Sequence, residues 1–368
     1  MDAKQKAKAT VHAYQQTLID LSHRIHDHPE LGFAEEQACR WITEVLADAG
    51  LHVEAGICDL PTAFRARAGH GPLHIAICAE YDALPKIGHA CGHNLMAAMS
   101  TGAGIAAAQV SNDLGLTIEV IGTPAEEVGN ASGKILLLER GAFEGIHAAM
   151  LVHPNPMPFD AIGASTLAVA LFDVHYTGKA SHAGVAPEQG INAADAMTIA
   201  QVAIGLLRQQ LPSTMRISGI VTDGGEAANI IPSHTSARYN LRAPTFEELL
   251  DLRARVIRCF EAGALATGAQ MEIVGGDKPY AHLVQNAALS ERYRRNAEAL
   301  GRVVQNGESR GAGTDMGNIS LVIPSIQPQI GINCLPAINH QPEFAAACVT
   351  PEADQAVLDG ALAMAWTI

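Results

Sequence analysis

The residue pair with the clearest capacity for chemistry is Cys91 and His93, in the run Gly-His-Ala-Cys-Gly-His-Asn. The short apolar segment 73–79 before this pair predicts a buried strand, and the Ala- and Gly-rich segment 95–110 after it predicts a buried helix. In α/β sheets, ligands bind where such a strand gives way to its helix. A thiolate and an imidazole at that place can reach neighbouring metal ions. The spacing alone fits equally well a buried cysteine beside a histidine in a turn, because cysteine often packs as a small apolar residue.

Two adjacent glutamates, Glu126 and Glu127, follow a second predicted strand, 117–121. Adjacent residues of an extended chain point in opposite directions, so the two carboxylates can serve different purposes. One can bind a metal ion while the other acts as a general base on a metal-bound water. A solvated acidic loop is the alternative interpretation of a bare Glu-Glu pair.

Two histidines lie near further strand ends. His153 comes directly after the predicted strand 147–152, and His340 lies in a loop after the segment 329–333. Each histidine alone is compatible with a structural role. With the residues above they make a set of five candidate ligands at predicted strand ends or loops of one domain: Cys91, His93, Glu127, His153 and His340. Sulfur, nitrogen and oxygen ligands in this mixture suit two borderline metal ions that share one site.

The elements that would position these residues alternate between helices and strands. Helices are predicted at 11–28, ending before Pro29, at 34–49, closed by Gly50, and at 133–140; strands are predicted at 51–57, 63–68, 73–79, 117–121 and 147–152. This βα alternation is typical of an α/β domain with a mostly parallel sheet.

The order of elements changes between residues 166 and 278. Predicted there are a strand at 167–176, a helix at 191–210, strands at 215–221 and 235–242, a helix at 245–267 and a strand at 270–274. The order β-α-β-β-α-β is that of a self-contained split-βαβ, ferredoxin-like unit. We therefore expect an α/β fold in which residues 1–165 and 279–368 form a mostly parallel-sheet domain and residues 166–278 form an inserted domain.

Composition excludes several classes of partner. The chain has 368 residues, 48% hydrophobic and 17% charged, which is globular and long enough for two or three domains. A net charge of −14 argues against binding to nucleic acid or to an anionic membrane surface. We find no apolar stretch of membrane-spanning length and no secretory signal at the N-terminus. The seven cysteines include no CxxC pair, which fits a reduced, cytoplasmic protein.

As a set, the motifs resemble those of the aminoacylase and carboxypeptidase family of dinuclear metallopeptidases, and specifically its amidohydrolase branch. That branch includes auxin-conjugate hydrolases, hippurate hydrolases and p-aminobenzoyl-glutamate hydrolase. The motifs that carry the resemblance are Glu80-Tyr81-Asp82-Ala83-Leu84-Pro85, Gly88 to Asn94, Pro124-Ala125-Glu126-Glu127, His153-Pro154, Gly178-Lys179-Ala180-Ser181-His182-Ala183 and Asn339-His340. They span nearly the whole chain in the family's order. The resemblance implies that residues 1–165 and 279–368 form the catalytic domain and that residues 166–278 form a lid or dimerisation domain.

The resemblance implies a role for each motif residue. Cys91 would bridge two divalent metal ions, Glu126 would be the general acid and base, and Asp82 would orient a ligand histidine. The two coordination shells would be completed by His93, Glu127, His153 and His340. The metal-bridging thiolate favours Zn²⁺, whereas members of the branch are often active with Mn²⁺, Co²⁺ or Ni²⁺.

Three residues of the insert resemble groups that act on the substrate. In relatives, a histidine at the position of His182 reaches across a homodimer interface to stabilise the tetrahedral oxyanion; a capping or surface histidine is the alternative. Asn229 and Arg242 resemble residues that hold the α-carboxylate, and the planar guanidinium of arginine pairs bidentately with such a group. Either residue could instead be an ordinary loop residue or ion-pair partner. The loop 313–318 resembles part of the active-site wall or is simply a tight turn.

The resemblance implies a hydrolase that cleaves the amide between an acyl or aminoacyl group and an amino acid with a free carboxylate. Tyr81 and Asn94 stand where many relatives have Met and Asp. These departures bring the chain nearer to p-aminobenzoyl-glutamate hydrolase and to dipeptidases of basic amino acids. Two other hypotheses are a non-catalytic binding relative and a hydrolase that uses Cys91 as a nucleophile with His93.

Overall fold

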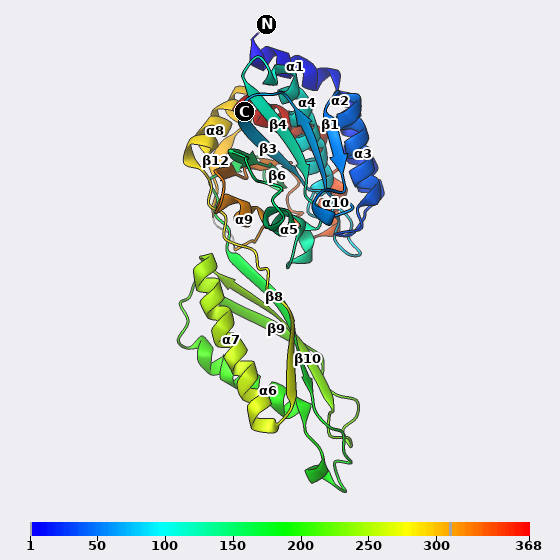
Figure 1. Ribbon diagram of the computed structural model, residues 1–368, viewed down its shortest axis with the longest axis vertical. Helices are drawn as coiled ribbons and strands as arrows, with labels where there is room; N and C mark the ends of the chain where they lie inside the picture. The colour runs from blue at the N-terminus through cyan, green and yellow to red at the C-terminus, as the bar shows by residue number, and fades with distance from the viewer. Residues whose placement is uncertain (1, 309–310) are drawn as a thin grey trace.

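The computed structural model describes residues 2–308 and 311–368, which form two bodies connected by two chain crossovers (Figure 1). The larger body contains both ends of the chain, and the smaller body is one continuous segment from β8 to β11. Each body has a buried apolar cluster of its own. The predicted fold class is confirmed, because an α/β body with a mainly parallel sheet carries an insert with a separate antiparallel sheet.

The larger body is built on a six-stranded sheet in the order β1-β2-β4-β3-β5-β13. Its strands are β1 (His52–Ala55), β2 (Phe64–Ala68), β3 (Leu73–Ala79), β4 (Leu116–Gly122), β5 (Ala148–Met150) and β13 (Ser325–Ile326). Strands β4, β3, β5 and β13 run parallel to one another, whereas β2 and β1 add an antiparallel edge. The parallel strands therefore end at one edge of the sheet, where chemistry is expected.

Helices cover this sheet, and α4 is the most buried of them. The helices of the larger body are α1 (Ala3–Ala13), α2 (Gln15–Asp27), α3 (Glu36–Asp48), α4 (His93–Ser111), α5 (Gly133–Glu139), α8 (Ala287–Ala299), α9 (Met316–Ser320), α10 (Pro342–Ala347) and α11 (Pro351–Thr367). Glycines of α4 allow close packing, since a Cβ at Gly102 would stand 2.7 Å from Leu18 and one at Gly104 would stand 2.2 Å from Val120. None of the helices in the described ranges is long and apolar enough to cross a membrane.

The prediction of one helix over 11–28 is wrong. The chain forms two helices instead, and the first begins at Ala3 because Asp2 and Gln5 form a reciprocal capping box. The helices meet at Tyr14, whose φ of −94° and ψ of 4° are not helical. The Lys- and Ala-rich start of α1 buries Ala7 and Val11, a stripe too sparse for a periodicity argument to find.

A small second sheet of the larger body was not predicted. Its order is β12-β7-β14-β6, with β6 (His153–Asn155), β7 (Asp160–Ile162), β12 (Val304–Asn306) and β14 (Gln329–Gly331). Each strand has three residues, too few to show an alternating pattern. The predicted strand 147–152 is shorter than expected, because the chain leaves β5 at Met150 and joins the second sheet at His153. The predicted strand 51–57 likewise ends early, where Gly56 turns with φ +70°.

The insert has the predicted β-α-β-β-α-β order. Its elements are β8 (Ala168–Thr177), α6 (Ala193–Arg208), β9 (Arg216–Asp223), β10 (His234–Ala243), α7 (Phe246–Thr267) and β11 (Gln270–Gly275). The sheet order is β11-β8-β10-β9 with every pair antiparallel. The two helices pack on one face, as Figure 1 shows, and β8 and β11 lead to the larger body.

Candidate active site

The turn after β3 brings Cys91 and His93 to the start of α4. Gly92, between them, has φ +82°, a left-handed conformation that favours glycine. A Cβ at this position would also stand 2.5 Å from Cγ of Pro154. The glycine therefore allows both the sharp turn and the close approach of β6.

Asp82 fixes the orientation of His93. The Nδ1–H of His93 donates to the backbone carbonyl and to Oδ1 of Asp82, each at 2.9 Å. Oδ2 of Asp82 accepts the backbone N–H of Glu127 at 2.9 Å. Nε2 of His93 is buried and makes no hydrogen bond among the described residues, although Oε2 of Glu80 lies 3.3 Å away. A histidine held in this way by a carboxylate presents its second nitrogen as a metal ligand would.

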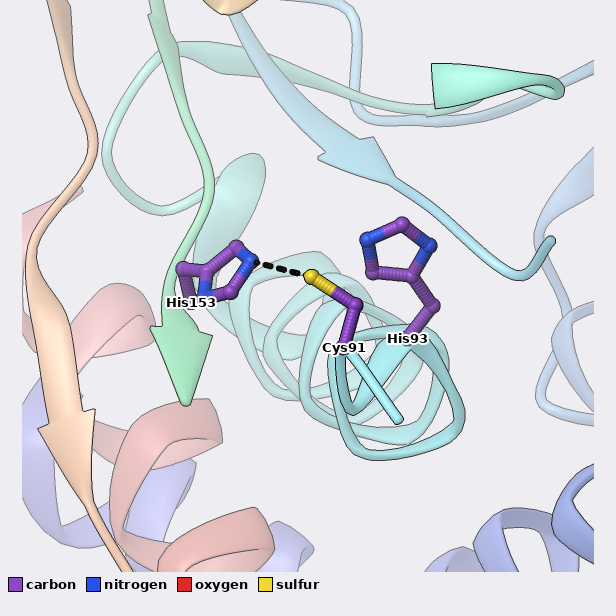
Figure 2. A group of neighbouring side chains, drawn as sticks. All are labelled: Cys91, His93 and His153. Atoms are coloured by element: carbon purple, nitrogen blue, oxygen red, sulfur yellow. Dashed lines mark hydrogen bonds between the residues drawn. The ribbon is translucent and has the colours of Figure 1, made fainter. Parts of the chain in front are cut away.

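Cys91 and His93, at the start of α4, and His153, on β6, lie next to one another, as Figure 2 shows. The Nδ1–H of His153 donates to the carbonyl of Pro154 at 2.7 Å, and Nε2 lies 3.3 Å from Sγ of Cys91. One ligand atom from each of the three residues lies within 4.8 Å of the other two. We call this group the first triad.

Cys91 also belongs to a second triad with Glu127 and His340, whose ligand atoms lie within the same 4.8 Å limit. His340 Nε2 lies 3.3 Å from Oε1 of Glu127, and its backbone N–H donates to Ala90 at 2.8 Å. The contact with Glu127 raises the pKa of His340. Burial opposes ionisation of Glu127, but His340 and His93 outweigh it and hold the pKa of that carboxyl below its usual value.

The two triads share one sulfur atom and fit two cations better than they fit a metal-free protein. Burial, together with the charge of Glu127, raises the pKa of the Cys91 thiol well above its usual value. A cation beside the sulfur would favour the thiolate, and it would satisfy the unpartnered Nε2 of His93. The donors are sulfur, imidazole and carboxylate, which suit borderline divalent metals.

Glu126 has a different environment from its neighbour Glu127. It is 9% exposed and forms a third compact group with Glu80 and His93, its Oε2 lying 3.9 Å from His93 Nε2. Burial, together with the charges of Glu80 and Glu127, raises the pKa of Glu126 well above its usual value. The adjacent glutamates thus have pKa shifts of opposite sign.

A buried ion-pair network beside this site was not predicted. Nζ of Lys134, which is fully buried, lies 2.5 Å from Glu80 Oε1 and 2.6 Å from Asp315 Oδ1. Glu80 and Asp315 both lie in segments that the sequence marks, the Glu-Tyr-Asp motif and the loop 313–318. Lys134 carries no such signal, because a lysine in a short helix is usually exposed. Only the tertiary structure identifies it.

A cavity of about 850 Å³ extends from the triads to the insert. Cys91 and Glu126 line one end, and Asn240 and Arg242 of β10 line another part of its wall. Arg242 is partly buried, which lowers its pKa, and it donates to the carbonyl of Gly311. The structure therefore brings Arg242 to the same cavity as the predicted metal ligands. Residues 313 and 314 of the glycine-rich loop also line it.

His182 and Asn229 lie elsewhere. The two segments pair through a bridge between His182 and Ile230, and the N–H of Ala183 donates to the carbonyl of Asn229 at 3.0 Å. Figure 1 shows the loops after β8 and β9 at the end of the insert remote from the larger body. Neither His182 nor Asn229 lines the cavity formed by the described part of this chain.

An α/β body with a ferredoxin-like insert, and beside its cavity two groups of side chains that could hold metal ions, are the features of a two-domain metallohydrolase. Residues 165–267 match the family described as the peptidase dimerisation domain. The Xaa-Arg dipeptidase of Mus musculus is 37% identical to the chain over 384 residues, which cover 99% of this chain and 88% of that protein.

A second relative and a solved structure are also similar to the chain. A subunit of the p-aminobenzoyl-glutamate hydrolase of Escherichia coli (strain K12) is 29% identical over 282 residues, covering 71% of this chain and 58% of that protein. A dinuclear metal binding peptidase of the M20 family from Bacillus subtilis has a similar fold, with a TM-score of 0.68, 23% identity and coverage of 97% of this chain and 99% of that chain. The chain belongs to the M20 peptidase family and is a hydrolase that acts on amide or peptide bonds. This confirms the resemblance found in the sequence.

Proposed function

We propose that the chain is a metal-dependent peptidase that cleaves the amide between an acyl or aminoacyl group and an amino acid with a free carboxylate. The observation that carries the proposal is the pair of triads sharing Cys91, with Glu126 beside them. Similarity to an Xaa-Arg dipeptidase and to p-aminobenzoyl-glutamate hydrolase supports this substrate class. Dipeptides that end in arginine or lysine are the first candidates, ahead of p-aminobenzoyl-glutamate and other N-acyl amino acids.

In this proposal each triad would hold one divalent ion. Cys91 would contribute to both sites, His93 and His153 would complete one, and Glu127 and His340 would complete the other. Such ions polarise a carbonyl group and lower the pKa of a water molecule. The shared thiolate favours Zn²⁺, with Mn²⁺, Co²⁺ or Ni²⁺ as alternatives.

Glu126 moves the proton in this reaction. Its carboxylate takes a proton from the attacking water and passes it to the leaving amide nitrogen. Burial raises the pKa of Glu126, which suits a group that must hold a proton before it gives it away. Arg242 faces the same cavity, where its guanidinium can pair with the substrate carboxylate.

We propose further that the working molecule is a homodimer in which the insert of one subunit serves the cavity of the other. The match to the peptidase dimerisation domain supports a dimer. His182 and Asn229 belong to the loops after β8 and β9, which lie at the end of the insert remote from the larger body (Figure 1), and neither lines the cavity that the described residues of this chain form. From a second subunit, His182 would donate to the oxyanion, and Asn229 would join Arg242 at the carboxylate.

The test is a substrate panel on metal-free protein and on protein loaded with Zn²⁺ or Mn²⁺. The panel contains dipeptides ending in Arg or Lys, p-aminobenzoyl-glutamate, N-acyl amino acids and indole-acetyl conjugates. We expect metal-dependent release of an amino acid from at least one class, and loss of that activity in EDTA. Activity that survives EDTA would support Cys91 as a nucleophile instead, because thiol chemistry needs no metal. A protein that binds two ions and cleaves nothing would contradict the proposed function.

A further inference from the structure

Tyr280 lies where the chain returns from the insert to the larger body. Its backbone N–H and carbonyl pair with those of Val169, near the start of β8, at 2.9 Å each. The side chain is 4% exposed and lines the cavity. This pair of residues therefore joins the two crossovers that connect the bodies.

The hydroxyl of Tyr280 is bonded to the turn that carries Glu126. The O–H donates to the backbone carbonyl of Glu126, and the oxygen accepts the N–H of Gly129 at 3.1 Å. The turn between them is a single short 3₁₀ segment, η2 (Glu126–Val128). Ala125 before it has φ +60° and Gly129 after it has φ +72°. A turn with a left-handed residue at each end needs surrounding contacts to stay in place, above all at the non-glycine position.

Two carboxylates of the larger body also hold this turn. Oε1 of Glu35 accepts the N–H of Ala125 at 2.7 Å, and Oδ2 of Asp82 accepts the N–H of Glu127 at 2.9 Å. Unlike Glu35 and Asp82, Tyr280 also pairs through its backbone with β8 of the insert.

We propose that Tyr280 is a positioning residue for Glu126, which ties the general base to the strand pair at the junction of the two bodies. The inference rests on the proposed function, because it takes Glu126 as the proton-transferring group. Loss of the hydroxyl leaves the carbonyl of Glu126 and the N–H of Gly129 without their partner. The carboxylate of Glu126 then samples a wider range of positions, and small misplacements of a reacting group lower the turnover rate steeply.

The first experiment needs neither substrate nor metal. Hydrogen–deuterium exchange is followed in peptides covering 125–131 for the metal-free wild type, Tyr280→Phe and Tyr293→Phe. Tyr293 on α8 is a matched control, since it is fully buried and its hydroxyl has no partner in the described residues. We expect several-fold faster exchange in Tyr280→Phe alone. Equal exchange in all three proteins would overturn the proposal.

The second experiment separates positioning from packing. With Zn²⁺-loaded protein and whichever panel substrate the wild type cleaves, we expect Tyr280→Phe to lower kcat by about 10- to 100-fold. KM should stay within about twofold and the zinc content unchanged, with Tyr293→Phe like the wild type. If Tyr280→Phe keeps the wild-type kcat while Tyr280→Ala loses it, the ring merely packs and the proposal is wrong. A wild type that cleaves nothing contradicts the proposed function instead, and the exchange comparison then decides the role of Tyr280.

Discussion

Glu126 and Glu127 are neighbours in the chain but face different groups. Glu127 contacts His340 and lies in the second triad, which keeps its carboxylate ionised. Burial, together with the charge of the neighbouring Glu80, raises the pKa of Glu126. A metal ligand must stay ionised and a proton carrier must exchange its proton, so the two environments match the two proposed roles.

Replacing Glu126 by Gln removes the proton acceptor while it preserves shape. We expect kcat to fall by about 10³-fold or more, in line with general-base contributions of about 10²–10⁴. Zinc content should remain at the wild-type value, because the two triads do not include Glu126. Steady-state kinetics and metal analysis of the same preparation check both points. Retained turnover in the metal-loaded variant would refute the assignment of Glu126.

Glu35 makes stability depend on pH in a predictable direction. Burial, together with the charge of Asp82, raises the pKa of Glu35 from 4.5 to about 7. The unfolded chain therefore loses this proton at lower pH than the folded chain does. The free energy of unfolding should fall as pH rises from 4.5 to about 7, by at most about 3 kcal/mol from this group.

In Glu35→Gln this contribution is absent. Urea unfolding of the metal-free protein at pH 5 and pH 8 should therefore show the variant gaining stability relative to wild type as pH rises. The exposed Glu54→Gln on β1 is the control and should give a constant difference. A constant difference for Glu35→Gln as well would contradict the prediction.

At the scale of elements, the turn that begins α4 determines where Cys91 and His93 lie. β3 ends at Ala79, and a loop connects it to the helix that begins at His93. Gly92 adopts the left-handed conformation that this turn needs, and its lack of a side chain leaves room for Pro154. The Cys-Gly-His spacing thus places the thiol of Cys91 and the imidazole of His93 on either side of one turn.

Gly92→Ala should destabilise the protein more than Gly115→Ala. Both glycines have positive φ, +82° and +67°, but a Cβ at Gly115 meets nothing within 4 Å. Backbone strain should cost about 1 kcal/mol at either position. Overpacking against Pro154 should add about 1–3 kcal/mol for Gly92→Ala alone. Unfolding experiments measure the difference, and zinc titration should show weaker binding for this variant. Equal losses of stability in the two variants would contradict this prediction and would mean that β6 moves to accommodate the added methyl group.

At the scale of the whole molecule, the site is divided between two bodies and, in our proposal, two subunits. The triads belong to the larger body, Arg242 approaches from the insert, and His182 lies at the far end of that insert. Within one chain, the triads and Arg242 meet at a single cavity. In our proposal, His182 reaches a cavity only in the dimer.

Hybrid dimers can test this arrangement. Glu126→Gln and His182→Ala are each expected to be nearly inactive as homodimers. In a hybrid, the His182→Ala subunit keeps its own Glu126 and receives His182 from its companion, so one of the two sites works. Hybrids purified with two affinity tags should recover about half of the wild-type activity per dimer. No recovery would show that His182 does not act across the dimer.

The sequence by itself determined the order of elements and the chemistry of the ligand set. Hydrophobic periodicity is a local property, so it located β3, α4 and all six elements of the insert to within a few residues. The short strands β6, β7, β12 and β14 were not predicted from the sequence, because a three-residue strand is defined by its pairing partner and not by its own hydrophobic pattern. The start of α1 at Ala3 was also not predicted, because too few of its residues are buried to give a periodic hydrophobic pattern.

Only the tertiary structure decided which of the chemical groups meet. It grouped the other four predicted ligands around Cys91, buried Lys134 between Glu80 and Asp315, and placed Tyr280 against the turn of Glu126. It also placed the loop that contains His182 at the end of the insert remote from the larger body. Motifs fix residue types and local turns, whereas burial, ion pairing and distance between segments depend on how strands that are remote in sequence pack together.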